Sequence, residues 1–227
     1  MIDADKLIFI AYYAPQEVEI AANRLRDFIS QLEQQGYYLI DGYAFPFSNP
    51  ENIIRESVQI DEKVSIICRQ GSLGGTLNFW QYPFEFSFAF LFEPEEDTEW
   101  MINVQTDTLM GSENNFGEEN ALKFVEVIKA ALKSYPPVYG CAVTLQEPPL
   151  PEDAYASEVV ELYPINFYSS SYVQKLGKEK LLAAPAWCVE EIANGVLLVP
   201  SIESIYTDDT VSIRMVKEYL GWEDSIE

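Results

Sequence analysis

The sequence predicts an α+β fold: a mainly antiparallel sheet built from hairpins, with three longer helices packed on it, in one globular domain over residues 1–227. Two observations favour this class. β-Prone runs follow one another across short turns that contain Gly or Pro, which is typical of hairpins. Segments with apolar residues at helical spacing are grouped around these runs, so an antiparallel sheet is favoured over a βαβ series.

The chain begins with a predicted strand, helix and strand. Lys6–Tyr13 is apolar and β-prone, and after Pro15 apolar residues recur at helical spacing as far as Leu32. Gly36 is placed to end this helix, because glycine adopts the positive φ of a C-terminal cap at little cost. Tyr37–Ala44 predicts the second strand.

The next region predicts a short helix and a hairpin. We expect the helix over Glu51–Ser57. Lys63–Arg69 predicts a strand, which the glycine-rich turn Gly71–Gly75 joins to a further strand, Thr76–Tyr82.

Aromatic residues occupy every even-numbered position from Phe84 to Phe92. Alternate side chains of a strand point to the same face, so we expect these phenylalanines to face the core. Thr98–Gln105 alternates again and predicts the adjacent strand.

The most regular helical pattern covers Phe116–Ser134, where Lys133 near the end complements the helix dipole. Val138–Leu145 predicts a strand. Gln146–Ser157 contains three Pro and predicts a loop or a seam between two subdomains, and Val159–Tyr163 predicts a further strand.

The strongest turn signal is Asn194-Gly195, which Trp187–Ile192 and Val196–Pro200 flank. A type I′ turn needs positive φ at both central residues, and Asn-Gly is the pair that accepts it most readily. These residues therefore predict a hairpin.

Helices are predicted on both sides of this hairpin. Ser169–Leu176 and Lys178–Ala183 predict two short helices. Val211–Leu220 predicts the last helix, with Asp209 or Thr210 as its cap.

The composition of the chain excludes several functions. It has 37 Asp plus Glu against 14 Lys plus Arg, a net charge of −23, so nucleic acid and anionic membranes would repel it and a basic protein partner is favoured. It contains no His, which removes imidazole-based catalytic triads and His-bearing zinc sites. Its three Cys form no C-x-x-C pair, so we expect buried thiols, with no metal and no cofactor.

The amino terminus predicts no export signal. It places Asp3, Asp5 and Lys6 before a short apolar run, whereas a signal peptide begins with basic residues and has a small-residue cleavage site. No run reaches the roughly 18 apolar residues of a membrane helix. We therefore expect a cytoplasmic protein; the oligomeric state does not follow from the sequence.

An acidic stretch is the main candidate interaction site. Between Arg69 and Lys123 the chain has ten acidic residues and no basic one, which should create a negative field that steers a basic partner. The predicted partner-binding residues lie at its centre: Glu93, Glu95, Glu96, Asp97, Glu99 and Trp100. The alternatives are a solvated acidic face and a cation site, but these carboxylates lack the spacing of an EF-hand loop.

A segment of the carboxy-terminal third resembles a known family. Leu176–Trp187 (LGKEKLLAAPAW) and Val189–Leu198 (VEEIANGVLL) resemble a segment of immunity proteins from bacterial polymorphic-toxin and contact-dependent systems. In that family the segment forms a helix, a Pro-Ala-Trp entry to a strand, and a hairpin. The resemblance implies an immunity protein, brings no catalytic residue with it, and leaves the class of toxin open.

Together these observations favour a non-enzymatic immunity-type protein that binds and neutralises a cognate basic toxin through its acidic surface, with Trp100 as an aromatic anchor. The alternative is an acidic binding or scaffold domain without a toxin partner. A carboxylate-based enzyme is the third possibility, which the absence of His and of any catalytic motif disfavours.

Overall fold

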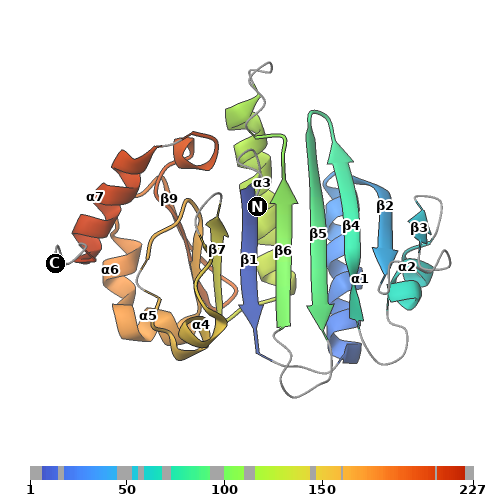
Figure 1. Cartoon of the computed structure of the whole chain (residues 1–227), viewed down its shortest axis with the longest axis horizontal. Coiled ribbons are helices and arrows are strands. Elements are labelled where there is room, and N and C mark those ends of the chain that lie inside the picture. Colours follow the sequence, from blue (N-terminus) through green and yellow to red (C-terminus); the bar gives the residue numbers. More distant parts are fainter. Residues whose placement is uncertain are drawn as a thin grey trace.

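The computed structural model describes residues 7–14, 18–44, 53–55, 59–67, 73–92, 100–109, 116–143, 147–159, 161–207 and 209–222. Within these residues, ten strands form one antiparallel sheet in the order β3-β2-β4-β5-β6-β1-β7-β8-β10-β9 (Figure 1). The strands are β1 (Leu7–Tyr13), β2 (Tyr38–Ala44), β3 (Ile53–Arg55), β4 (Leu73–Gln81), β5 (Phe84–Phe92), β6 (Trp100–Thr106), β7 (Tyr139–Val143), β8 (Asn166–Tyr168), β9 (Cys188–Ile192) and β10 (Gly195–Val199).

Helices pack on this sheet, so the predicted α+β class is confirmed. They are α1 (Val18–Gln34), α2 (Ile60–Ile67), α3 (Gly117–Ser134), α4 (Pro151–Ala156), α5 (Ser170–Leu176), α6 (Lys178–Leu182) and α7 (Thr210–Leu220), with a 3₁₀ turn η2 (Glu203–Ile205) before α7. Strands from both sides of the predicted seam at Gln146–Ser157 belong to the same sheet.

The helices cover different parts of the two sheet faces. α1 and α3 lie behind the sheet in Figure 1, and together with α2 they enclose the first core with β1, β4, β5 and β6. α4 to α7 lie on the opposite face, where they enclose the second core with β7, β8 and β10. β1 serves both cores, since Phe9 and Ala11 face the first and Ile10 and Tyr12 the second. Burial on both faces explains why this strand is apolar throughout.

The aromatic face of β5 is confirmed at four of its five phenylalanines, while the side chain of Phe92 lies outside what the structure describes. Phe84, Phe86, Phe88 and Phe90 are all buried in the first core. The ring of Phe88 lies 4.4 Å from that of Phe28 in α1, so the strand and the helix are joined by direct aromatic packing.

The predicted hairpin is confirmed as β9 and β10, but its turn lies one residue earlier than expected. Ala193 and Asn194 have positive φ values of 52° and 61° and separate the paired residues Ile192 and Gly195. Gly195 is the first residue of β10, and a Cβ at this position would clash with the backbone oxygen of Tyr168. The glycine therefore allows close approach of β8 to β10.

The predicted strand at Lys63–Arg69 is wrong. Its described part belongs to helix α2, where Val64 and Ile67 are buried against the first core. Ile60, Val64 and Ile67 fall at helical spacing. Asp61 and Glu62 in the first turn stabilise the helix by interacting favourably with its dipole. The hairpin partner of β4 is accordingly β5.

The predicted helix at Glu51–Ser57 is also wrong in its described part. Ile53–Arg55 is strand β3, which pairs with β2 at one end of the sheet. Ile54 is buried between its exposed neighbours, which is the alternation of a strand that has one face on a core.

Two predictions near the proline-rich stretch need correction. The stretch predicted as a loop contains α4, which Pro151 begins as its first residue, a position where the missing N–H costs nothing. Val159–Tyr163 forms no strand in its described part, because the Asn166 side chain accepts from the Tyr163 N–H and donates to its carbonyl, closing a turn before β8.

The predicted cap of the last helix is confirmed. The Asp209 carboxylate accepts from the backbone N–H groups of Val211 and Ser212 at 3.1 and 3.3 Å. None of the described helices is long and apolar enough to cross a membrane.

Candidate partner-binding surfaces

Most of the predicted partner-binding segment lies outside the part of the chain that the structure describes: Glu93, Glu95, Glu96, Asp97 and Glu99. Trp100 is the first residue of β6, and its backbone lies opposite Tyr13 at the end of β1. The residues that flank the segment therefore lie at the end of the sheet where β5 and β1 end and β6 begins.

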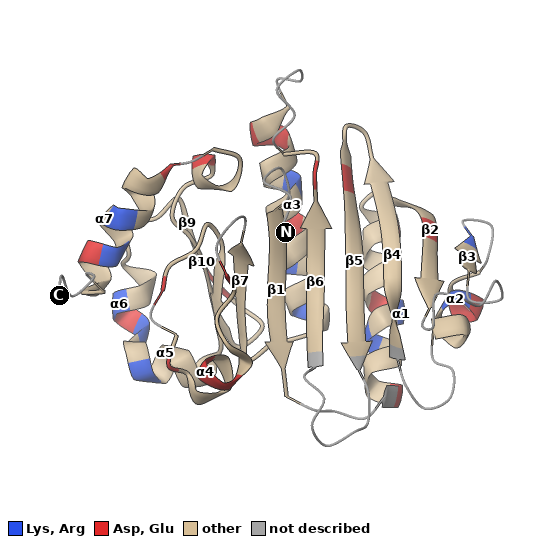
Figure 2. Ribbon diagram, viewed as in Figure 1, with Lys and Arg blue, Asp and Glu red and all other residues tan. Residues whose placement is uncertain are grey.

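A second acidic surface lies at this same end of the sheet, around α4. Between Lys133 and Lys175 the chain has five acidic residues and no basic one. We call these residues the acidic α4 surface: Glu147, Glu152, Asp153, Glu158 and Glu161. All but Asp153 are exposed, and Figure 2 shows α4 at the lower end of the sheet. Lys175 of α5 borders this surface, because its ammonium donates to the backbone oxygen of Ser157 at the end of α4 at 2.9 Å.

Two hydrogen bonds fix α4 to the central strand. The Tyr155 hydroxyl donates to the backbone oxygen of Tyr13, and the Tyr12 hydroxyl donates to that of Pro149, both at 2.8 Å. Leu150 and Tyr155 remain 58% and 38% exposed beside the carboxylates. The surface therefore combines negative charge with apolar side chains on a fixed element, as protein-binding surfaces do.

A third surface is the face of β2, β4, β5 and β6 opposite α1 to α3, which no described helix covers (Figure 1). We call it the uncovered sheet face. None of its side chains is fully buried, whereas their strand neighbours on the other side are. Its side chains are Tyr38, Ile40, Asp41, Tyr43, Thr76, Asn78, Trp80, Glu85, Ser87, Ala89, Leu91, Met101, Asn103 and Gln105.

Side-chain hydrogen bonds order the middle of the uncovered sheet face. Asn78 donates to the Asp41 carboxylate at 2.6 Å, and the Ser87 hydroxyl donates to the Asn78 carbonyl at 2.6 Å. These two hydrogen bonds link β2, β4 and β5 and hold the polar side chains in one arrangement. Towards the β4–β5 turn the face becomes aromatic, with Tyr38 60% and Trp80 41% exposed.

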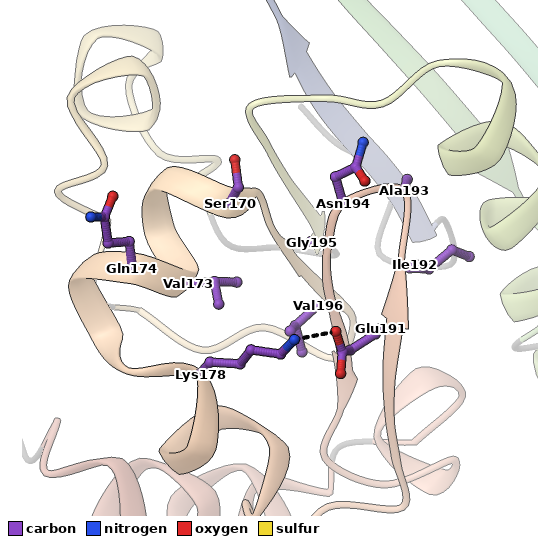
Figure 3. Close-up of a pocket in the computed structure, with 10 residues that line it drawn as sticks. All are labelled: Ser170, Val173, Gln174, Lys178, Glu191, Ile192, Ala193, Asn194, Gly195 and Val196. Atoms are coloured by element: carbon purple, nitrogen blue, oxygen red, sulfur yellow. Dashed lines mark ion pairs between the residues drawn. The ribbon is translucent and has the colours of Figure 1, made fainter.

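A groove of about 660 Å³ lies between α5 and the tip of the β9–β10 hairpin (Figure 3). The ammonium of Lys178 meets the Glu191 carboxylate at 2.5 Å on one side, and Ser170 and Asn194 stand on the other. Because Glu191 is already paired with Lys178, the groove attracts a basic partner less strongly than the two acidic surfaces do.

The described thiols are suited to packing and not to nucleophilic attack. Burial raises the pKa of Cys141 and, more weakly, that of the half-buried Cys188. Both thiols therefore stay protonated at neutral pH, whereas the thiolate is the reactive form. Among the described residues no group of three or more Cys, Asp or Glu could hold a metal ion.

Sequence reasoning named only the acidic segment around Glu95, which stays a prediction, and it did not name the acidic α4 surface, the uncovered sheet face or the groove. The absence of Lys and Arg from residues 134–174 was a usable signal for the acidic α4 surface. The uncovered sheet face had a weaker signal, because alternation shows that a strand has two unlike faces but not which face the helices leave open.

No family model and no curated protein sequence matches this chain. Among solved structures, the chain is similar to PA0821, a type VI secretion system (T6SS) protein of Pseudomonas aeruginosa, with a TM-score of 0.59 and 11% sequence identity. The alignment covers 95% of this chain and 72% of that chain. At this identity the likeness shows a shared fold.

Proposed function

We propose that this chain is a non-enzymatic, cytoplasmic immunity-type protein that binds and neutralises a basic protein toxin. The observation that carries the proposal is the distribution of its charge. The net charge is −23, and the acidic α4 surface lies at the same end of the sheet as the residues that flank the acidic segment around Glu95.

Such a charge distribution accelerates the capture of a basic enzyme. A negative field several ångströms from the surface raises the encounter rate of a positive partner, and the gain falls as salt screens the field. Carboxylates that pair with Arg and Lys around a toxin's active site would also occlude that site.

Two further observations support the proposal. The segment from Leu176 to Leu198 resembles immunity proteins, and it folds as that resemblance implies, into a helix followed by a hairpin. The structural neighbour is a T6SS protein, a setting compatible with toxins and their immunity proteins.

The candidate toxin for the test is any basic protein that the genome encodes beside this gene. Purified chain should inhibit it at a stoichiometric ratio, and the association rate should fall by about tenfold or more between low salt and about 0.5 M salt. Absence of binding at micromolar concentrations of both proteins would overturn the proposal.

The uncovered sheet face favours a second candidate, an acidic binding or scaffold domain. Its exposed Tyr38 and Trp80 could dock a partner without blocking any activity. The same experiment separates the two functions, because a scaffold would bind the neighbouring protein and leave its activity intact.

A further inference from the structure

Three side chains of different chemistry stand in one row at the end of the uncovered sheet face. Tyr38 of β2 lies directly opposite Trp80 of β4, and Trp80 lies directly opposite Glu85 of β5. Directly opposed residues of antiparallel strands have Cβ atoms about 5 Å apart, so the two rings and the carboxylate are neighbours. All three are exposed.

Within the part of the chain that the structure describes, no Lys or Arg of the protein pairs with this row. β2, β4, β5 and β6 contain no Lys or Arg. Among the described residues, no ion pair includes Glu85, and Lys123, which donates to the backbone oxygen of Tyr82 at 2.9 Å, is paired with Glu119 at 3.1 Å. The Glu85 carboxylate is therefore available to an external cation.

The row is also held in place before any partner arrives. Lys123 of α3 anchors the β4–β5 turn at Tyr82, and the Gln81 side chain donates to the backbone oxygen of Gln35 at 2.9 Å beyond α1. Two helices thus fix the turn that carries Trp80 and Glu85. A fixed site loses less conformational freedom on binding than a mobile one.

Two aromatic rings beside a carboxylate match the chemistry of a guanidinium group. Arg stacks on the faces of Trp and Tyr through cation–π attraction and pairs with carboxylates through its fork of N–H donors. Trp, Tyr and Arg are also the residues that dominate binding energy at protein interfaces.

We propose that Tyr38, Trp80 and Glu85 form a subsite that takes an arginine side chain of the basic partner. This inference rests on the proposed function and names part of its contact surface. The uncovered sheet face then contributes an anchor, while the acidic α4 surface and the segment around Glu95 contribute steering.

The probe that tests the subsite is a peptide of alternating arginine and glycine, compared with the same peptide containing citrulline, which is neutral and nearly isosteric. The readout is the indole N–H resonance of Trp80 in the full chain, assigned by its loss in Trp80→Leu. We expect the arginine peptide to shift this resonance in a saturable manner and the citrulline peptide to leave it unchanged.

Matched variants separate a subsite from general acidity. Glu85→Gln should weaken binding of the arginine peptide about three- to fivefold, whereas Glu179→Gln, which removes an exposed carboxylate of α6 outside the acidic α4 surface, should change it less than about twofold. Trp80→Leu should weaken it similarly, and Trp187→Leu, at a tryptophan that is 46% exposed, should not. Equal losses from both members of either pair would overturn the subsite.

The two proposals fail in different ways. If the wild-type chain does not bind the toxin encoded beside its gene, the immunity function fails while the peptide titration still reports on the subsite. If the toxin is bound and inhibited equally by wild type, Trp80→Leu and Glu85→Gln, the subsite is wrong and the immunity function stands.

Discussion

The hydroxyl of Tyr155 in α4 donates a hydrogen bond of 2.8 Å to the backbone oxygen of Tyr13, the last residue of the central strand β1. This contact joins the acidic α4 surface to the strand that serves both cores. Together with the hydrogen bond from the Tyr12 hydroxyl to the backbone oxygen of Pro149, it holds the carboxylates in position relative to the sheet.

Replacing Tyr155 by Phe should lower the free energy of unfolding by about 1 kcal/mol, because the hydrogen bond is lost and the ring is kept. Urea unfolding followed by tryptophan fluorescence measures the change. Tyr219→Phe is the control, since its hydroxyl makes no hydrogen bond within the described residues and it is 42% exposed. Equal effects of the two substitutions would contradict the role given to the Tyr155 contact.

Reversing charge on the acidic α4 surface should slow capture of the toxin. We expect Glu152→Lys with Glu158→Lys to reduce the association rate about tenfold at low salt, because the local field changes sign over α4. Glu203→Lys with Glu218→Lys alters the net charge equally at a distant element and should cost about twofold. Stopped-flow fluorescence gives both rates, and similar losses would show that net charge alone matters.

The segment predicted from the sequence has its own test. Lysine substitutions at Glu95, Glu96 and Asp97 should slow association several-fold, with dissociation changed less, because exposed charges act mainly on the encounter. Surface plasmon resonance resolves the two rates. An unchanged association rate would place the interface elsewhere on the chain.

Two substitutions in the β9–β10 hairpin should act in opposite directions. Gly195→Ala should destabilise the fold by about 2 kcal/mol, because the new Cβ would press on the backbone oxygen of Tyr168. Ala193→Gly should stabilise it by about 0.5 kcal/mol, because Ala193 has a φ of 52° that glycine adopts without strain. Chemical denaturation measures both; the same sign for both would contradict the turn geometry.

Stability should fall at alkaline pH. Burial, with the charge of Glu126 as a second cause, raises the pKa of Tyr37 from 10.0 to about 12. The unfolded chain therefore releases this proton first, so the stabilising contribution is complete below about pH 10 and is lost as pH rises from there towards about pH 12. Burial also raises the pKa of Tyr139 and Tyr168, which adds to the loss.

Urea unfolding between about pH 8 and about pH 11 measures this dependence. Tyr37→Phe should make the decline less steep. Tyr38→Phe, at the adjacent residue that is 60% exposed, is the matched control and should leave the decline as in wild type. A wild-type stability that does not fall over this range would contradict the assignment.

The elements that the sequence predicted well are those whose pattern has a single solution. Alternating phenylalanines from Phe84 to Phe92 fit only a strand that packs one face against a core. Asn194 indicates a hairpin whatever the exact bounds of the two flanking strands. The pattern of Lys63–Arg69 was ambiguous because a short apolar run can form a strand or a helix. The helix is favoured because it packs Val64 and Ile67 together against the first core.

The candidate surfaces were harder to predict than the elements. The acidic residues near Glu152 are few and stand among prolines that indicated a loop, so α4 was not expected to present them. The row of Tyr38, Trp80 and Glu85 joins three separate strands. Its existence depends on the register of β2 against β4 and of β4 against β5, and the β4–β5 turn sets only the second of these.

The central position of β1 has a consequence for synthesis of the chain. β1 precedes both of its neighbours in the chain by many residues, since these neighbours are residues 100–106 and 139–143. During synthesis, both backbone edges of β1 therefore remain unpaired until these later residues have emerged from the ribosome. Such distant pairing makes folding slow, and nascent chains that stop before β7 expose an aggregation-prone strand that chaperones must shield.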